Sequence, residues 1–229
     1  MRRDPFSAAM EDFTRRLAAI AELKKAGKWE ELLKIIAVGL NRVLRTSPQE
    51  FRRLTETGLL AQLIKGTPTV WVPYKKIMLI ALLKETGDYA AMKDPPGGGY
   101  VWYLKALHLL LDALAHDELH GYQQLVPTVD SLLAALGDRR VPVRTRLLLA
   151  REFESRGQFG RVRDEFLAAL RSSPDNSRLV GFGMAILERI GRENDATLAA
   201  GGLLRREIEA TMADLIHRSA EESGGQSKA

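Results

Sequence analysis

The sequence predicts an all-α protein built from antiparallel helical hairpins, with no β-sheet. The clearest evidence is the segment 143–176, VRTRLLLAREFESRGQFGRVRDEFLAALRSSPDN, in which apolar residues recur at helical spacing on both sides of Gly157. After this glycine, Phe159, Phe166 and Leu170 lie at i, i+7 and i+11, so they share one helix face. A single hairpin cannot bury both of its faces. We therefore expect neighbouring hairpins to stack against it.

Amphipathic helices also account for the first third of the chain. Residues 7–26 and 28–44 each carry apolar side chains on one face and are separated by a glycine. Residues 47–50, SPQE, combine an N-cap residue, a proline at the first helical position and a glutamate at the third. This pattern predicts that a short helix begins at Pro48. A further brief helix is expected over residues 59–64.

Prolines and glycines punctuate the middle of the chain. Residues 67–73 contain two prolines, which predicts an extended or looped stretch before a helix over residues 74–86. We expect that helix to end at the corner 87–89, Gly-Asp-Tyr. The run 93–99, KDPPGGG, is the clearest loop of the chain. Residues 100–116 are apolar nearly all round, so we expect them to form the most buried helix.

The C-terminal half continues the helical pattern. Helices are expected over 129–136 and 179–190, and the last element is divided by Gly201 and Gly202 into a short helix and a longer one beginning near Leu203. Together these elements predict a single domain of about eleven helices. We expect residues 1–94 to form its N-terminal helical region, residues 95–99 a Pro/Gly-rich loop, residues 100–218 a repeat-like helical region and residues 219–229 a disordered tail.

The central hairpin resembles a tetratricopeptide repeat when it is counted in a frame of about 34 residues. The resemblance rests on the order of its small, aromatic, glycine and proline positions, namely Leu149, Ala150, Phe153, Gly157, Phe159, Phe166, Ala169 and Pro174. Gly191 stands one such period after Gly157, so a second unit is expected. The resemblance implies that the hairpins stack as a right-handed α-solenoid. We expect Phe153 and Phe166 to anchor the central hairpin.

A second resemblance covers most of the chain. The blocks LIALLKETGDY, LLLAREFESRGQFGRVRDEFLAAL and LAAGGLLRREIEATMADL, after an amphipathic N-terminal helix, look like an uncharacterised family of bacterial all-helical proteins with a tetratricopeptide-repeat-like C-terminal half. The resemblance implies a bacterial source. It implies no activity, because the family has none that is established.

Composition limits the classes of protein that remain. The 229 residues include no cysteine, which excludes disulfides and thiolate metal sites and favours a reducing cytoplasm. The N-terminal residues lack the long apolar run of a secretory signal, and no stretch of about 18 uncharged apolar residues predicts a membrane span. The formal net charge is +5, which permits an anionic partner without requiring one.

Two motifs are typical of ligand sites. His116 and His120, in the segment HDELH, have the i, i+4 spacing at which two imidazoles on one helix face can reach a metal ion. No third ligand follows, and at a helix end both rings can instead face solvent. The glycines at 97–99 lack both a preceding strand and a following Lys-Ser or Lys-Thr, so they do not form a phosphate loop. We expect no catalytic residue and no cofactor.

Arginines in the central hairpin predict the binding surface. Arg144, Leu147 and Arg151 lie at i, i+3 and i+7, on the helix face that the repeat resemblance turns toward a concave groove. Arg178 occupies the position equivalent to Arg144 one repeat later. Guanidinium groups bind carboxylates through paired donors, so these four residues predict a groove for an acidic peptide. Acidic residues interspersed among the arginines leave open that the face is only solvated.

The preferred hypothesis is therefore a non-enzymatic scaffold for protein–protein interaction, of unknown pathway and oligomeric state. A nucleic-acid binder that uses the same arginines against phosphates is the alternative, and it would bind with steep salt dependence. A metal-dependent enzyme that uses the HDELH segment is a more remote alternative.

Overall fold

The described part of the chain is helical throughout its regular secondary structure. The computed structural model describes residues 5–45, 53–95, 97–119, 121–174 and 176–225. These residues form α-helices and two short 3-10 turns, and they contain no strand, so the all-α prediction is confirmed. The chain divides into two units, Met1–Arg139 (unit 1) and Arg140–Ala229 (unit 2), which we describe separately.

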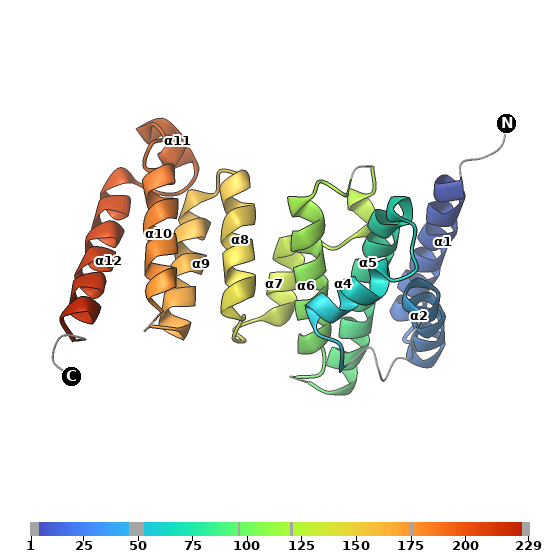
Figure 1. The fold of residues 1–229 in the computed structure, drawn as a ribbon. Helices are drawn as coiled ribbons and strands as arrows, with labels where there is room; N and C mark the ends of the chain where they lie inside the picture. The colour runs from blue at the N-terminus through green and yellow to red at the C-terminus, as the bar shows by residue number, and fades with distance from the viewer. Residues whose placement is uncertain (1–4, 46–52, 96, 120, 175, 226–229) are drawn as a thin grey trace. The chain divides into compact units, whose positions relative to one another are not determined.

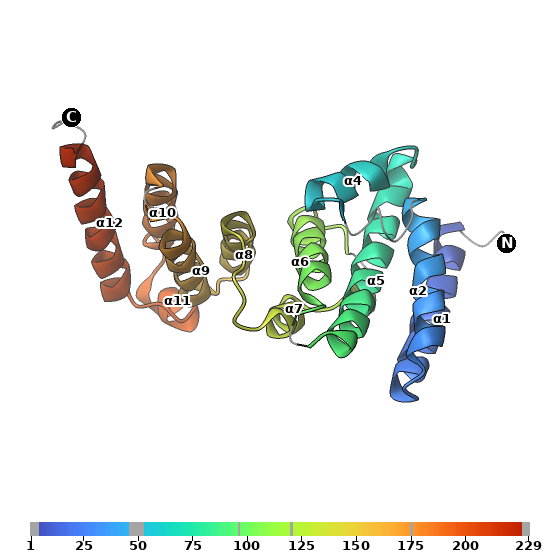
Figure 2. The same cartoon turned by 90° about the horizontal axis from the view of Figure 1, so that it is seen from below.

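Unit 1 contains six of the described α-helices. They are α1 (Pro5–Lys25), α2 (Trp29–Leu44), α4 (Glu56–Ile64), α5 (Val72–Lys93), α6 (Tyr100–Ala115) and α7 (Val129–Leu136), with 3-10 turns at Thr69–Trp71 and Gln123–Leu125. α5 is the central helix, because it packs against α1, α2, α4 and α6. Figures 1 and 2 show α5 and α6 side by side in both views. α6 is buried along most of its length, as its composition predicts.

α5 does not end where the sequence predicts. The predicted corner at residues 87–89 lies inside the helix, which continues to Lys93. Gly87 makes room for a neighbour, because a Cβ at this position would lie 2.5 Å from the ring of Tyr103 on α6. The prediction of a helix terminus at this glycine is therefore wrong, since its missing side chain instead lets two helices approach closely.

The beginning of α5 also differs in detail from the prediction. The expected extended or looped stretch 67–73 contains a 3-10 turn, Thr69–Trp71, that leads directly into α5. Pro73 lies in the first turn of α5, where its missing N–H leaves no hydrogen bond unmade. The helix start predicted at Pro48 falls outside the described residues.

The glycine-rich loop holds α5 and α6 together. A Cβ at Gly98 would lie 2.2 Å from the carbonyl oxygen of Ala90, and one at Gly99 would lie 2.5 Å from the ring of Tyr103. The loop is therefore packed tightly against α5. The division between the units lies instead at Arg139 and Arg140.

Unit 2 contains the five remaining described helices. They are α8 (Val143–Ser155), α9 (Phe159–Ser172), α10 (Ser177–Ile190), α11 (Asp195–Ala200) and α12 (Arg205–Gly225). α8 and α9 form the predicted antiparallel hairpin, and they pack side by side (Figure 1). Gly157 between them has φ of 67°, a conformation that side chains disfavour. Phe153 and Phe166 are each 1% exposed, in accordance with the predicted apolar face.

Gly201 and Gly202 form the turn between α11 and α12, as predicted. The structure gives this turn a packing role, because the Gly160 N–H donates to the carbonyl oxygen of Gly201 at 2.9 Å. A Cβ at Gly201 would lie 2.4 Å from the carbonyl oxygen of Gly157. The glycine pair therefore fits directly against the corner of the central hairpin.

α12 extends to Gly225, whereas the sequence predicts a disordered tail from residue 219. Glu221 and Glu222 are good helix formers, which favours continuation of the helix past the last core residue. Among the residues that the structure describes, no helix is both long and apolar enough to span a membrane.

Candidate partner-binding surface

The structure places the four predicted binding residues on two helices of unit 2. Arg144, Leu147 and Arg151 share one face of α8, and Arg178 lies in the first turn of α10. The three arginines are exposed and Leu147 is half-buried. All four side chains thus lie at least partly at the surface of the unit.

An ion pair shows that the two helix faces adjoin each other. Glu154 continues the α8 face by one further turn beyond Leu147 and Arg151. Its carboxylate accepts two hydrogen bonds from the Arg189 guanidinium of α10, with N–O distances of 2.6 and 2.9 Å. Arg189 lies 11 residues after Arg178, on the same face of α10.

Figure 1 shows that α8 and α10 run parallel. The ion pair agrees with this direction, because Glu154 and Arg189 are both close to the C-terminal ends of their helices. Arg144 and Arg178 lie in the first turns of these helices and therefore at the same end. Because Glu154 is engaged by Arg189, it does not neutralise Arg151 by a direct ion pair.

Several other arginines of unit 2 have structural partners. Arg146 of α8 pairs with Glu165 of α9 at 2.8 Å, and Arg163 of α9 pairs with Glu207 of α12 at 2.6 Å. Hydrogen bonds from the Leu204 N–H and from Arg163 lower the pKa of Glu207. By contrast, Arg151 and Arg178 make no ion pair with any residue that the structure describes.

Phe182 is a surface residue that the sequence analysis missed. Its side chain is 40% exposed, which is unusual for a phenylalanine in a helix with a buried apolar stripe. It lies four residues after Arg178 and seven before Arg189, so it shares their face of α10. The helical register of Arg178 was the signal that could have found it. We call Arg144, Leu147, Arg151, Arg178 and Phe182 together the α8/α10 face.

The space beside Phe182 is open. A Cβ built on the preceding residue, Gly181, would meet no atom within 4 Å. The surface therefore presents an aromatic ring next to one glycine that has no side chain, with Arg178 and Arg189 on the same helix face. This arrangement offers both charge and apolar contact to a partner.

The histidine motif is not assembled into a metal site by the described residues. His116 is exposed, and its Nδ1 lies 2.8 Å from the carbonyl oxygen of Asp112. No group of three or more metal-ligating side chains occurs in the described ranges of the chain. His120 lies outside the described residues, so the pair itself is untested.

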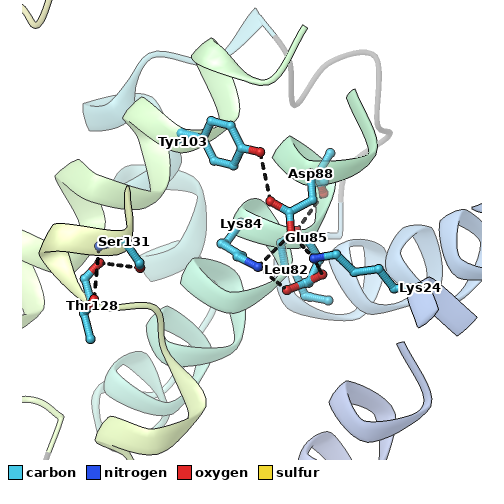
Figure 3. Close-up of polar contacts among 9 residues, drawn as sticks. Lys24, Leu82, Lys84, Glu85, Asp88, Tyr103, Thr128 and Ser131 are labelled. Carbon is cyan, nitrogen blue, oxygen red and sulfur yellow. Dashed lines mark hydrogen bonds and ion pairs between the residues drawn. The ribbon is translucent and has the colours of Figure 1, made fainter. Parts of the chain in front are cut away.

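Unit 1 contains a network of charged side chains that links three helices (Figure 3). Lys24 of α1 and Lys84 of α5 both bind the carboxylates of Glu85 and Asp88. The Tyr103 hydroxyl of α6 donates to Asp88 at 2.8 Å. Two lysines balance two carboxylates, so the network is internally satisfied and acts to hold α1, α5 and α6 together.

The network shifts the ionisation of its members. Burial alone would raise the pKa of Asp88, but hydrogen bonds from Lys24 and Lys84 outweigh it and lower the pKa. Burial likewise opposes the charge of Lys84, yet its hydrogen bond to Asp88 and the charge of Glu85 raise its pKa. Burial and the hydrogen bond to Asp88 raise the pKa of Tyr103. The folded state therefore favours a charged Asp88, a charged Lys84 and a neutral Tyr103.

A second ion cluster lies deeper in unit 1. Lys76 of α5 is 3% exposed, and its Nζ donates to Asp112 of α6 at 2.6 Å and to Glu118 beyond the end of α6. A buried lysine requires such partners, because an unpaired charge in the interior is strongly unfavourable. The cluster accounts for the burial of this charge.

Comparison with known proteins identifies no relative: no protein-family model, no curated protein and no solved structure matches the chain. The candidate surface is therefore interpreted from its own geometry.

Proposed function

We propose that the chain is a non-enzymatic protein-interaction scaffold that binds an acidic segment of a partner on the α8/α10 face. The observation that carries the proposal is the bidentate pair between Arg189 and Glu154. It joins the two helix faces and engages Glu154, the acid that shares the α8 face with Arg151. Exposed Phe182 lies on the same surface.

The chemistry of this face favours a peptide that is both acidic and apolar. Each guanidinium presents paired donors that match a carboxylate, and Arg151 and Arg178 come from neighbouring helices. An apolar or aromatic side chain of the partner fits beside Phe182, where Gly181 leaves space. Contacts of this mixed kind dominate binding energy in many protein interfaces.

The scaffold proposal includes a tetratricopeptide-repeat-like stacking of the helices of unit 2 into a right-handed α-solenoid. The antiparallel α8/α9 hairpin, with α10 parallel to α8, supports it. The proposal also includes a bacterial source and a cytoplasmic location, for which the resemblance of the sequence and its lack of cysteine are the support.

A fluorescence-anisotropy titration with a labelled peptide tests the proposal. The probe is a peptide of about twelve residues in which Asp and Glu flank a central Phe, a length that, when extended, spans roughly the width of three or four helices. A matched peptide carries Asn and Gln instead. We expect the full chain to bind the acidic peptide at least tenfold more tightly at physiological salt, a difference of about 1.4 kcal/mol.

Two double variants locate the binding site. Arg151→Glu with Arg178→Glu should abolish binding of the acidic peptide and leave the melting temperature nearly unchanged, because neither arginine has a described ion pair. Arg171→Glu with Arg206→Glu is the control, since it changes the net charge equally at exposed positions of α9 and α12. An equal loss of affinity for the acidic peptide in both variants would show that only the net charge of the protein matters, and it would contradict the proposal.

The same titration with mixed-sequence single-stranded DNA tests the alternative function, which is nucleic-acid binding. A nucleic-acid binder should prefer DNA to the peptide and should lose affinity steeply with salt. Tighter binding to DNA than to the acidic peptide at physiological salt would replace the scaffold proposal.

A further inference from the structure

An apolar pocket lies in unit 1, between α1, α2 and the beginning of α5. Its volume is about 220 Å³. The apolar side of its lining is formed by Ala9, Phe13, Val43, Trp71, Met78 and Leu82. Since these residues come from three helices and a 3-10 turn, the pocket is a feature of the folded unit.

Cationic side chains line the same pocket. Arg16 of α1, Arg42 of α2 and Lys75 of α5 all contribute to its wall, together with the single acid Asp12. The Arg16 Nε donates to the Asp12 carboxylate at 2.9 Å, and the Arg42 guanidinium lies 3.8 Å from it. The wall of the pocket thus contains one carboxylate and three cations, so the pocket retains positive charge.

Lys75 has no carboxylate partner in the described residues. Its Nζ donates to the neutral Thr67 hydroxyl at 2.9 Å. Burial, and then the nearby charge of Arg45, lower the pKa of Lys75, because both disfavour a further positive charge there. An anion bound beside Lys75 would relieve this cost.

We propose that this pocket binds a free single-chain carboxylate of about eight carbons, with its tail among the apolar side chains and its headgroup at Arg16, Arg42 and Lys75. The size follows from volume, since a cavity of about 150 Å³ holds a benzene-sized ligand of six carbons. In proportion, this pocket has room for about eight to ten heavy atoms. The charge follows from the excess of cations over acids.

Other ligand classes fit the pocket less well. A small inorganic anion would leave the apolar lining in contact with water, and a cationic amphiphile would meet three like charges. An uncharged alcohol would fill the tail site without engaging the cations. The occupant that uses both features is therefore an amphiphilic monoanion, which is independent of the acidic partner proposed for unit 2.

Isothermal titration calorimetry of the full chain with butanoate, hexanoate, octanoate and dodecanoate tests the proposal. Each methylene removed below eight carbons should weaken binding about threefold, the equivalent of ~0.7 kcal/mol. Affinity should stop rising beyond about eight carbons, where the pocket is full, so dodecanoate should bind no more tightly than octanoate. Octanol and octylammonium should each bind at least tenfold more weakly than octanoate.

Trp71 supplies a local readout, because it lines the pocket. Octanoate should change the tryptophan fluorescence of the protein, and the change should disappear in Trp71→Phe while calorimetric binding persists. A change that persists in this variant would show that octanoate binds near Trp29 or Trp102 instead and would overturn the assignment.

Three variants locate the site. Ala9 is a half-buried residue of α1 that lines the pocket, so Ala9→Phe places a ring into the pocket and should weaken octanoate binding at least tenfold. Lys75→Gln should weaken it about fivefold and should bring the affinity for octanoate closer to that for octanol. Lys34→Gln is the control, because this exposed lysine of α2 does not line the pocket.

Besides the fluorescence result, the inference would be overturned by any of three further results. The first is an affinity for octanoate no higher than that for octanol. The second is an unchanged affinity for octanoate in Ala9→Phe, provided that its circular dichroism and melting temperature match those of the parent. The third is an equal loss of octanoate affinity in Lys75→Gln and Lys34→Gln. None of them bears on the α8/α10 face, which lies in the other unit.

Discussion

Gly183 of α10 lies directly against the ring of Phe166 of α9. A Cβ built on Gly183 would stand 1.8 Å from Cζ of that ring, far inside van der Waals contact. The absence of a side chain at this position therefore allows α10 to close over the central hairpin. Both residues are buried, and close packing in the interior leaves little room for an added side chain.

Gly183→Ala is accordingly expected to destabilise the protein by about 1–3 kcal/mol, through overpacking against Phe166. Gly181→Ala, two residues earlier in the same helix, is the matched control, because its Cβ would meet no atom within 4 Å. Alanine should there stabilise the helix by about 0.5–1 kcal/mol. Urea denaturation of both variants measures the contrast, and equal effects would contradict the packing of α10 on Phe166.

Phe153 and Phe166 are expected to anchor the hairpin. Each is 1% exposed, so truncation of either to Ala should cost about 3–5 kcal/mol. The control is Phe182→Ala, the same change at a ring that is 40% exposed, which should cost less than about 1 kcal/mol. Chemical denaturation gives all three values. A cost below about 1 kcal/mol at Phe153 or Phe166 would show that the assigned buried face is wrong.

The central hairpin could be predicted because each of its local signals agrees with its packing. The apolar stripe of Phe159, Phe166 and Leu170 has the helical period, and Gly157 marks the turn with a left-handed conformation that glycine favours. The Gly201–Gly202 break is likewise visible in the sequence. Its contact with Gly157 is not, because sequence periodicity carries no information on which turn packs against which.

Unit 1 is predicted less accurately because its glycines serve packing between helices. Gly87 has the sequence context of a helix end, Gly-Asp-Tyr, yet α5 continues through it to accommodate Tyr103. A local signal cannot distinguish a glycine that ends a helix from one that admits a neighbouring ring. For the same reason the sequence predicts a boundary at the loop 95–99, although Gly98 and Gly99 pack closely against α5 and α6.

The candidate surface was predictable only to a degree. Helical spacing places Arg144, Leu147 and Arg151 on one face of α8, and the face is at the surface as expected. The partner of Glu154 cannot be deduced from the sequence, because Arg189 is 35 residues away and several nearer arginines compete for it. The ion pairs within the fold decide which arginines can still bind a partner, and these pairs are known only from the structure.

The charged network of Lys24, Lys84, Asp88 and Tyr103 predicts two regions of pH in which stability is lost. The folded-state pKa of Asp88 is lowered, so its contribution is present above about pH 4 and is lost as the pH falls below this value. The pKa of Lys84 is raised, so its contribution is present below about pH 10.5 and is lost as the pH rises further. The pKa of Tyr103 is also raised, so folding disfavours its ionised form and stability is again lost at high pH.

Urea midpoints measured from about pH 2 to about pH 12 test this prediction, since the range spans both limbs. Asp88→Asn should flatten the acid limb and should also weaken the alkaline limb, because Lys84 loses its hydrogen-bonded partner. Asp138→Asn, at an exposed acid that follows α7, is the comparison for general charge effects. If both variants have the same pH profile as the parent, the network does not contribute to stability in the way that its geometry implies.

Glu154→Gln tests whether charge on the α8/α10 face controls binding. The substitution removes the carboxylate that neutralises Arg189, so a further guanidinium becomes available to an acidic partner. Affinity for the acidic peptide should rise about threefold to tenfold, which corresponds to ~0.7–1.4 kcal/mol. The ion pair is exposed on the Arg189 side, where the side chain is 57% accessible, so the loss of stability should stay below about 1 kcal/mol. Glu188→Gln is the control, since it removes the same charge from the adjacent position of α10 without releasing Arg189. A gain in affinity that is equal in both variants, or absent from Glu154→Gln, would place the acidic partner on another surface.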